Sequence, residues 1–193
     1  LKKLSGGSLM FFVAVPLDRT AAAAIEPYRA YMREHYGCRS GQRTPPHITL
    51  IPPFKTEDKS TEEVAAILLE SVSSAQAILP LPFSSRVPGF GAFGQRTLYA
   101  KILPDERWNS LRDTLWQTLS NELPLSPLRT PFIPHLTIAN RDIPPQSIRE
   151  ALDHLNSKNV SLIFTVDRLA LYELQEGYWM QIAVFPGLDD HTT

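Results

Sequence analysis

The chain of 193 residues is long enough for one domain, or for two small lobes that share a core. Its 19 basic and 20 acidic residues give a formal net charge of −1, which disfavours a protein that coats long nucleic acid but is compatible with a ligand that has few phosphates, such as a nucleotide or an RNA end. The single cysteine, Cys38, excludes an internal disulfide framework and is typical of a reducing compartment, so we expect a cytoplasmic protein.

The chain begins with a segment, 1–9, that we expect to be a flexible leader in front of a single domain at 10–193. The apolar run LMFFVAVPL follows Lys2 and Lys3 and therefore loosely resembles a signal peptide. Because this run is short and continues into an aspartate, we interpret it as a β-strand. No apolar run approaches the roughly 18 residues of a transmembrane helix, and we expect no membrane partner.

Two parts of the chain show the same order of patterns. A strand-like apolar run that leads into Pro and Asp occurs at 11–20 and again at 98–108. Each is followed by a helical pattern and then by a stretch with a histidine. In chain order the sequence predicts helices at 19–36, 60–74, 106–122 and 144–157, and strand pairs at 81–102 and 162–184.

The spacing within the two parts agrees to one residue. Val13 precedes His47 by 34 positions, and Ala100 precedes His135 by 35 positions. We therefore predict an α+β fold of two lobes related by a pseudo-two-fold axis, each with a small antiparallel sheet and with helices outside. The predicted lobes consist of 10–20 with 98–143, and of 38–97 with 144–186.

Two stretches carry residue types suited to acid–base chemistry. They are RTPPHITLIPPF, which contains His47 and Thr49, and RTPFIPHLTI, which contains His135 and Thr137. Residues two apart in a strand share a face, so each His-Thr pair should point into a cleft while the flanking aliphatics face the core. One imidazole can take a proton while the other gives one, and threonine hydroxyls can hydrogen-bond phosphate oxygens. This combination suits metal-free cleavage or transfer at a phosphodiester.

Alternative readings of these stretches remain open. The two motifs can be ordinary core strands, and a lone His-x-Thr is weak evidence, since it also occurs by chance at His191. Two histidines can also bind zinc, but neither has a Cys, Asp or Glu beside it, and Asp142 is seven positions beyond His135. We therefore expect no metal, and we interpret His35 and His154 as surface or helix residues.

The stretches PPHITLIPPF and PFIPHLTIANRD resemble the paired His-x-Thr motifs of the 2H phosphoesterase superfamily, especially its 2′-5′ RNA ligase (LigT-like) branch. The opening MFFVAVPLD also resembles the first strand of that family, and the resemblance covers about Met10 to Phe185. It implies a duplicated, bilobal fold in which two antiparallel sheets flank a central cleft. The implied activity is hydrolysis of 2′,3′-cyclic phosphates to 2′-phosphates, or formation and cleavage of 2′-5′ linkages, without a metal or other cofactor.

The resemblance also implies a role for each motif residue. His47 would protonate the 3′ oxygen, His135 would activate water, and Thr49 and Thr137 would bind the phosphate. The residues themselves do not distinguish the acid from the base, and reversal of the reaction exchanges the two roles.

Six further residues are candidates for binding the substrate: Arg43, Phe54, Arg129, Phe132, Arg141 and Trp179. The arginines can meet a phosphate or be ordinary surface residues. Many relatives carry Arg five positions after the second histidine, where this chain has Asn140, which puts the role of the following arginine in doubt. The aromatic side chains can stack on a base or line the cleft, with packing in the core as the alternative.

Two other classes of function are compatible with the sequence. One is a catalytically silent module that binds a nucleotide in the same cleft, and the other is a protein-interaction scaffold with incidental histidines. Among substrates, RNA ends, RNA-processing intermediates, cyclic nucleotides and ADP-ribose cyclic phosphate present similar phosphates. Nothing in the sequence demands an oligomer, so we expect a monomer.

Overall fold

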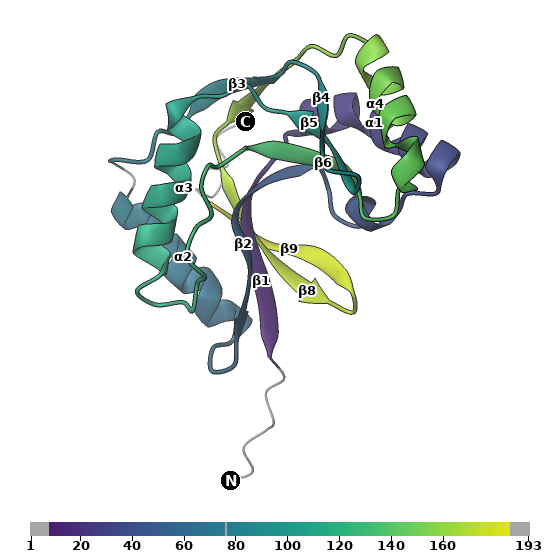
Figure 1. Cartoon of the computed structure of the whole chain (residues 1–193). Helices are drawn as coiled ribbons and strands as arrows, with labels where there is room; N and C mark the ends of the chain where they lie inside the picture. The colour runs from purple at the N-terminus through teal and green to yellow at the C-terminus, as the bar shows by residue number, and fades with distance from the viewer. Residues whose placement is uncertain (1–7, 76, 186–193) are drawn as a thin grey trace, which may run out of the picture.

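The computed structural model describes residues 8–75 and 77–185, and Figure 1 shows the whole chain. In chain order the elements are β1 (Leu9–Pro16), α1 (Arg19–Tyr36), the 3-10 helix η1 (Ser40–Gln42), β2 (His47–Thr56), α2 (Thr61–Ala75), β3 (Phe83–Val87), β4 (Phe90–Phe93), β5 (Thr97–Lys101), α3 (Glu106–Leu119), β6 (His135–Asn140), the 3-10 helix η2 (Pro145–Ser147), α4 (Ile148–Ser157), β7 (Leu162–Val166), β8 (Leu169–Gln175) and β9 (Tyr178–Phe185). All four predicted helices are present, although η2 forms the start of the predicted fourth helix.

The strands form two antiparallel sheets, which confirms the predicted α+β fold class. A seven-stranded sheet has the order β4-β5-β6-β2-β1-β8-β9, and β3 pairs with β7 in a two-stranded sheet. The order is symmetric about the junction of β6 and β2, because β5 and β4 follow on one side as β1 and β8 follow on the other. Only β9 has no counterpart in this order. The strand order therefore has the pseudo-two-fold relation that the repeated patterns predict.

The segments are distributed between the two halves differently from the prediction. We expected 10–20 beside 98–143, but β1 pairs with β2 and β8, whereas β5 pairs with β4 and β6. The physical reason is that each long βα connection returns the chain antiparallel beside the strand it left. The two motif strands therefore belong to opposite halves and meet only at the centre of the large sheet.

The helices are exchanged between the halves. α1 connects β1 to β2 but packs against β6 and β7, and α3 connects β5 to β6 but packs against β2 and α2. Figure 1 shows α2 and α3 together at one end of the molecule and α1 and α4 together at the other. Aspartates begin both exchanged helices, since Asp18 accepts a hydrogen bond from the backbone N–H of Ala21 and Asp105 from that of Arg107.

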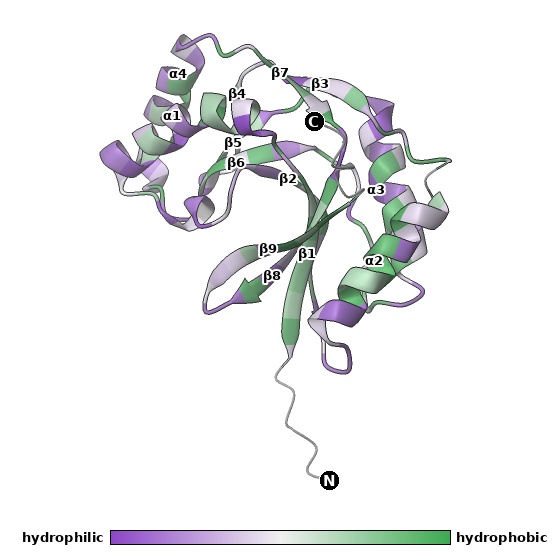
Figure 2. Cartoon of the chain, turned by 180° about the vertical axis from the view of Figure 1, so that it is seen from behind, coloured by the Kyte–Doolittle hydropathy of each residue, from purple (hydrophilic) through white to green (hydrophobic). Residues whose placement is uncertain are grey.

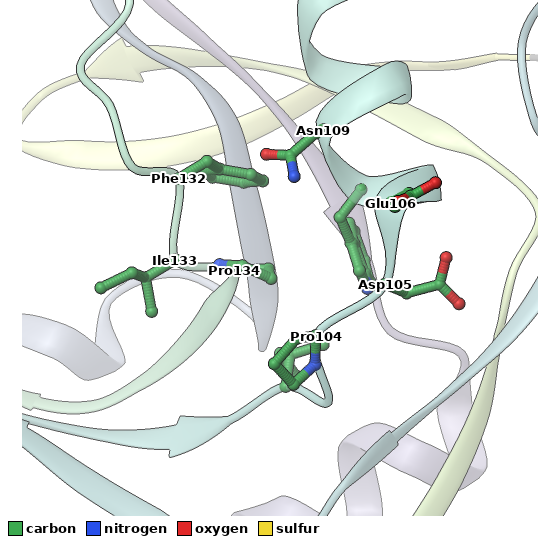
Figure 3. Close-up of a pocket in the computed structure, with 9 residues that line it drawn as sticks. Pro104, Asp105, Glu106, Asn109, Phe132, Ile133 and Pro134 are labelled. Carbon is green, nitrogen blue, oxygen red and sulfur yellow. The ribbon is translucent and has the colours of Figure 1, made fainter.

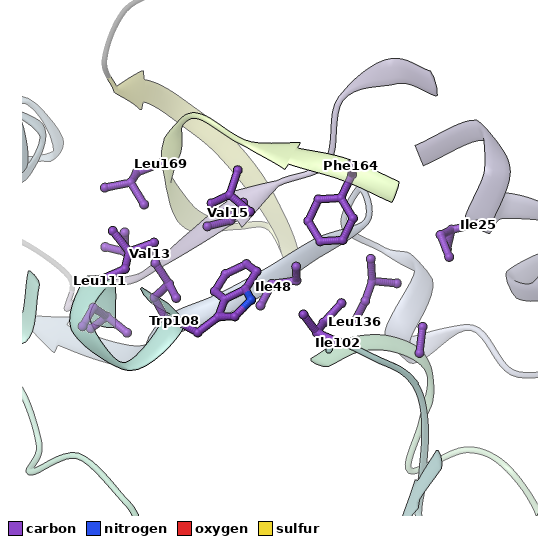
Figure 4. Close-up of a cluster of buried hydrophobic side chains, with 14 of the residues drawn as sticks. Val13, Val15, Ile25, Ile48, Ile102, Trp108, Leu111, Leu136, Phe164 and Leu169 are labelled. Atoms are coloured by element: carbon purple, nitrogen blue, oxygen red, sulfur yellow. The ribbon is translucent and has the colours of Figure 1, made fainter. Parts of the chain in front are cut away.

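The main hydrophobic core lies between the large sheet and these helices. Figure 4 shows Trp108 and Leu111 of α3 packed near Val13 and Ile48 of the central strands. All four side chains are buried. Figure 2, which colours the chain by hydropathy, shows β1 as mainly hydrophobic and the outer helices as mixed. This packing holds the central strands rigidly beneath the predicted cleft.

The ends of the chain test the remaining predictions only in part. β1 begins at Leu9, one residue before the predicted start of the domain, and the apolar run is a central strand as interpreted. The predicted leader apart from its last two residues, and the tail with His191, lie outside the described residues. Among the helices described, none combines the length and the apolar character needed to cross a membrane.

Candidate active site

The two motif strands meet at the centre of the large sheet. β2 and β6 share one register pair, in which Ile48 lies opposite Leu136. Both side chains are fully buried in the main core. Since neighbouring residues of a strand point to opposite faces, the polar residues on either side of this pair project from the other face of the sheet. The sequence prediction that the aliphatic face is buried is confirmed.

The register also determines which polar residues are neighbours. Continued by one step in each direction, the antiparallel register of this pair puts His47 opposite Thr137 and Thr49 opposite His135. Directly opposite residues of an antiparallel pair have Cβ atoms about 4.5–5.5 Å apart. The structure therefore brings all four motif residues together on one face, as an alternating square of two imidazoles and two hydroxyls.

Both imidazoles are oriented by the same kind of hydrogen bond. The Nδ1 atom of His47 lies 2.8 Å from the carbonyl oxygen of Pro45, and the Nδ1 atom of His135 lies 2.8 Å from that of Ile133. A carbonyl can only accept, so the geometry assigns the proton of the neutral ring to Nδ1 in each case. The Nε2 atom of each ring therefore carries the lone pair that is available to a ligand or to water.

Burial keeps both histidines neutral near pH 7. It lowers the pKa of His47 to about 4, and the charges of Arg29 and His135 act in the same direction, while the hydrogen bond to Pro45 opposes them. Burial likewise lowers the pKa of His135, against the opposing hydrogen bond to Ile133. The effect of His135 on the pKa of His47 is consistent with their shared face, and neutral rings are the form that can accept a proton.

An aromatic cluster supports the ring of His47. Phe12 of β1 lies 5.0 Å from the imidazole between ring centroids, and Tyr172 of β8 lies 5.5 Å from it. Phe12 and Tyr172 stack at 4.6 Å, and the predicted residue Trp179 meets Phe12 edge-on at 4.7 Å. Trp179 is half-buried and lies one ring away from His47. Its role in lining the cleft stays a prediction.

A second pair of aromatic residues supports His135. Phe93 lies 4.9 Å and Tyr99 5.4 Å from its imidazole, and the two aromatic rings stack at 4.1 Å. Gly91 makes room for this arrangement, because a Cβ atom there would lie 2.8 Å from Cζ of Tyr99. The sequence analysis missed these aromatic neighbours. The repeat could have indicated one aromatic neighbour of each histidine. Phe12 directly precedes Val13 and Tyr99 directly precedes Ala100, and these are equivalent positions of the two repeat units.

A cavity of about 700 Å3 opens beside the square of polar residues. Thr49 and His135 line it, together with the predicted binding residues Arg129 and Phe132. Arg112 of α3 also lines it and was not anticipated from the sequence. Its side chain is almost completely buried, its Nη1 donates to the carbonyl oxygen of Arg129 at 3.1 Å, and its guanidinium lies 4.3 Å from the ring centroid of Phe132. The guanidinium also donates from Nε and Nη2 to the carboxylate of Asp113, so it enters the cavity wall as an ion-paired group beside an aromatic ring.

The remaining three candidates do not line this cavity. Phe54 is 5% exposed and packs 5.9 Å from Phe11 in the main core, so it cannot stack on a base, and the core alternative holds. Arg43 is exposed, and its guanidinium lies 5.8 Å from the ring of Tyr178. Arg141 follows β6 in a left-handed turn, with φ of 66°, and is also exposed. Contact of these two arginines with a substrate stays a prediction.

The segment that leads into the first motif is anchored from both sides. The Asp142 carboxylate accepts hydrogen bonds from the backbone N–H groups of Ser40, at 2.7 Å, and Arg39, at 2.5 Å. From α1, the Nη2 of Arg29 donates to the carbonyl oxygen of Thr44 at 2.8 Å. Arg29 and its counterpart on α3 are both buried, and each fixes the backbone ahead of one histidine. Asp142 thus holds the backbone of the segment that precedes His47.

The residues that the structure describes offer no candidate metal centre. Nowhere in 8–75 or 77–185 do three or more His, Cys, Asp or Glu side chains gather as a metal ion would require. The expected absence of a metal cofactor stays a prediction.

Known proteins resemble this chain in sequence and in fold. The model of the family described as the 2′-5′ RNA ligase superfamily matches residues 16–177. A protein of Geobacillus sp. (strain WCH70) named "Putative phosphoesterase" is 29% identical over 161 residues, which cover 82% of this chain and 84% of that protein. The RNA 2′,3′-cyclic phosphodiesterase of Geobacillus stearothermophilus is 29% identical over 201 residues, which cover 91% of this chain and 56% of that protein.

Two crystal structures illustrate the shared fold. A protein of Thermus thermophilus superimposes with a TM-score of 0.61 at 23% identity, covering 91% of this chain and 96% of that one. E. coli LigT complexed with 3′-AMP superimposes with a TM-score of 0.60 at 17% identity, covering 93% of this chain and 98% of that one. These likenesses confirm the predicted LigT-like fold.

Proposed function

The chain belongs to the 2′-5′ RNA ligase superfamily, and from this premise we propose that it is a metal-independent 2H phosphoesterase. Its proposed reaction is hydrolysis of 2′,3′-cyclic phosphates to 2′-phosphates, or formation and cleavage of 2′-5′ linkages in RNA. The observation that carries this proposal is the register pair of Ile48 and Leu136, which places both His-Thr pairs on one face of adjacent strands. That arrangement offers two proton-transfer groups and two hydroxyl donors to a single phosphate.

In the proposed hydrolysis, each motif residue has one task. The Nε2 atom of neutral His135 takes a proton from water as the water oxygen forms a bond to phosphorus. The bond from phosphorus to the 3′ oxygen breaks, and protonated His47 gives its proton to that oxygen. Thr49 and Thr137 donate hydrogen bonds to the non-bridging oxygens, where negative charge is concentrated. The products are a 2′-phosphate and a free 3′-hydroxyl.

The bound anion favours the protonated form of His47, so the ring can take up from solvent the proton that its acid role needs. Burial disfavours the charged imidazole in the empty cleft, and the pKa of His47 is about 4. A phosphodiester carries one negative charge and would sit beside both rings, which favours their charged forms. Substrate binding therefore prepares the acid at His47, whereas His135 acts from its neutral form and accepts the proton of the attacking water.

The named relatives support a nucleotide or an RNA end as the partner of this site. E. coli LigT has been crystallised as complexes with 3′-AMP, with NADP+ and with ATP. The Geobacillus stearothermophilus relative is named for action on 2′,3′-cyclic phosphates of RNA. In this chain, the cavity beside Thr49 and His135 is lined by an arginine, Arg129, suited to phosphate, and is bordered by an aromatic side chain, Phe132.

A turnover assay tests the proposal directly. Wild type, His47→Ala and His135→Ala are compared on 2′,3′-cyclic nucleotides and on a 2′-5′-linked dinucleotide, with products identified by 31P NMR. Each substitution is expected to lower kcat by about 10²–10⁴-fold, and EDTA should have no effect. His35→Ala serves as the matched control, since that histidine stacks on Tyr31 of α1 outside the site.

Two results would contradict the proposal. Nucleotide binding that persists while wild type turns over no substrate favours a silent binding module. Turnover that survives replacement of both histidines removes them from the mechanism. Monomeric state and cytoplasmic location are further predictions, to be checked by light scattering and by cell fractionation.

A further inference from the structure

A second cavity, of about 550 Å3, lies at the start of α3. Figure 3 shows Phe132 and Asn109 beside each other at its border, with Glu106 and Pro104 around the same space. We propose that this cavity is the subsite for the base of the nucleotide that carries the reacting phosphate. The inference rests on the proposed function, which it deepens by naming a class of preferred bases.

The second cavity adjoins the cleft with the histidines. Phe132 and Ile133 line both cavities, and Pro134, which lines the second, directly precedes His135. The side chain of Ile133 is 47% exposed, so the wall between the cavities is a surface ridge. A nucleotide whose phosphate sits at His135 can therefore reach the second cavity by crossing one two-residue ridge. The volume lies within the range of about 300–1,000 Å3 that is usual for small-molecule sites.

Phe132 gives the second cavity a fixed aromatic surface. The guanidinium of Arg112 lies 4.3 Å from the ring centroid, and Arg112 lines the first cavity but not the second. One face of the ring is thus occupied by the buried arginine, which leaves the rest of the ring to border the second cavity. The rings of Pro104 and Pro134 add flat apolar surface around it. A planar base is the part of a nucleotide that such surfaces favour.

The polar groups of the cavity select against phosphate and in favour of a base. Asp105 and Glu106 line the cavity with carboxylates and Asn109 with an amide. The guanidinium of Arg107 binds both oxygens of Asp105, so Glu106 and Asn109 are the groups that remain for a ligand. The hydrogen bonds from Arg107 hold the pKa of Asp105 near 2, so this carboxyl is ionised at neutral pH. The carboxylate of Glu106 disfavours a phosphate, whereas its oxygens and the amide oxygen of Asn109 can accept hydrogen bonds from exocyclic amines. Adenine, guanine and cytosine carry such an amine, whereas uracil offers only its ring N3–H between two carbonyl oxygens, so the cavity should prefer the first three.

A kinetic comparison of bases tests this preference. Wild type and Asn109→Ala are assayed with the 2′,3′-cyclic phosphates of adenosine and uridine and with the base-free cyclic phosphate of methyl riboside. The substitution should raise KM about tenfold for the adenosine substrate and less than twofold for the other two, with kcat within twofold throughout. Phe132→Leu should raise KM for both nucleotides but not for the base-free substrate, because stacking does not depend on the amine.

A matched substitution on the same helical segment controls for general effects. Asn121 is exposed just beyond the end of α3, and its amide donates to the carbonyl oxygen of Gln117. Asn121→Ala should leave all three KM values unchanged. Equal changes on all substrates in Asn109→Ala, or no change on any, would overturn the subsite.

A binding experiment separates this inference from the proposed reaction. Affinities for adenosine 2′-monophosphate and uridine 2′-monophosphate are measured by calorimetry, which requires no turnover. A loss of affinity of about tenfold for the adenosine ligand alone in Asn109→Ala supports the subsite, even if no cyclic phosphate is hydrolysed. Turnover without any base-selective loss overturns the subsite and leaves the proposed reaction intact. If there is neither turnover nor a base-selective loss of affinity, both the subsite and the proposed reaction are overturned.

Discussion

Binding of inorganic phosphate in the cleft should raise the pKa of His47 from about 4 towards neutrality. The structure provides the reason for both values. Burial disfavours the charged ring in the empty site, with smaller contributions from Arg29 and His135, and an anion beside the ring reverses the balance. The proposed acid role depends on this change, because an imidazole that remains deprotonated has no proton to give.

The size of the expected change follows from two energies. A fall from the ordinary value of 6.5 to about 4 corresponds to roughly 3 kcal/mol against the charged ring. One negative charge about 4 Å away stabilises it by about 4 kcal/mol at an effective dielectric constant of about 20. The attraction is therefore large enough to offset the burial, and a rise of about two to three pKa units is expected.

Nitrogen-15 NMR of the histidine side chains measures this change. Spectra are recorded across the acidic and neutral pH range with and without inorganic phosphate, and His47→Gln identifies the signal. The same spectra report the tautomer, which should carry its proton on Nδ1 in the free protein because of the carbonyl of Pro45. In kinetics, kcat/KM reports the pKa of His47 in the free enzyme and kcat reports its raised pKa in the complex with substrate. With increasing pH, kcat/KM should therefore begin to fall at a lower pH than kcat.

Either of two results would refute this reasoning. A pKa near 6.5 for His47 without phosphate would mean that burial does not act on the ring as the structure indicates. An unchanged pKa in protein saturated with phosphate would mean that the anion binds away from His47, and the acid role would then be lost.

Three further predictions concern stability and local order. The pKa of His47 is lower in the folded than in the unfolded protein, so the unfolded state takes up a proton first as the pH falls from 6.5 towards 4. The free energy of unfolding, measured by urea denaturation, should therefore fall by about 2 kcal/mol more in wild type than in His47→Gln between about pH 7 and about pH 4.5. The same pH dependence in both proteins would contradict this. Asp142→Asn weakens the acceptor for the backbone N–H groups of Arg39 and Ser40, so hydrogen exchange at both amides should accelerate, and unchanged protection would show that the carboxylate is not needed. Ile48→Ala removes a fully buried side chain and should lower the free energy of unfolding by about 2–5 kcal/mol, whereas a loss below about 1 kcal/mol would contradict tight packing at the junction.

Local periodicity made the polar square predictable from sequence. The alternation of side chains in a strand depends only on adjacent residues, so the shared face of His47 and Thr49 follows from the motif itself. The repeat then indicated that His135 and Thr137 do the same in the second unit. The observed burial of the intervening aliphatic residues agrees with that prediction.

The burial of Phe54 agrees with the simple alternation of its own strand. Phe54 lies an even number of positions from Ile48 and Leu50, so alternation alone places it on the core face with them. Two irregularities in the pairing with β1 lie between Thr49 and Phe54, and because each adds one residue to β2, together they restore this alternation. The prediction that Phe54 stacks on a base overlooked this parity.

Contacts between distant strands were beyond local patterns. Phe12 meets Tyr172 because β1 pairs with β8, and local periodicity does not specify the register of that pairing. Arg112 was overlooked for a related reason, since charge on a helix usually faces solvent and only the path of the segment around Arg129 encloses it. The assignment of segments to lobes failed because α1 and α3 cross to the half opposite their own strands.

The crossing of these two helices has a consequence for how the molecule unfolds. Since α3 covers β2 and α1 covers β6, neither repeat unit can complete a core without the other. The duplicated halves should therefore lose structure in one cooperative transition, with the same midpoint by tryptophan fluorescence and by circular dichroism. A single unit expressed alone would expose the apolar faces of its strands. It could bury these faces again only by exchanging helices with a second copy of itself.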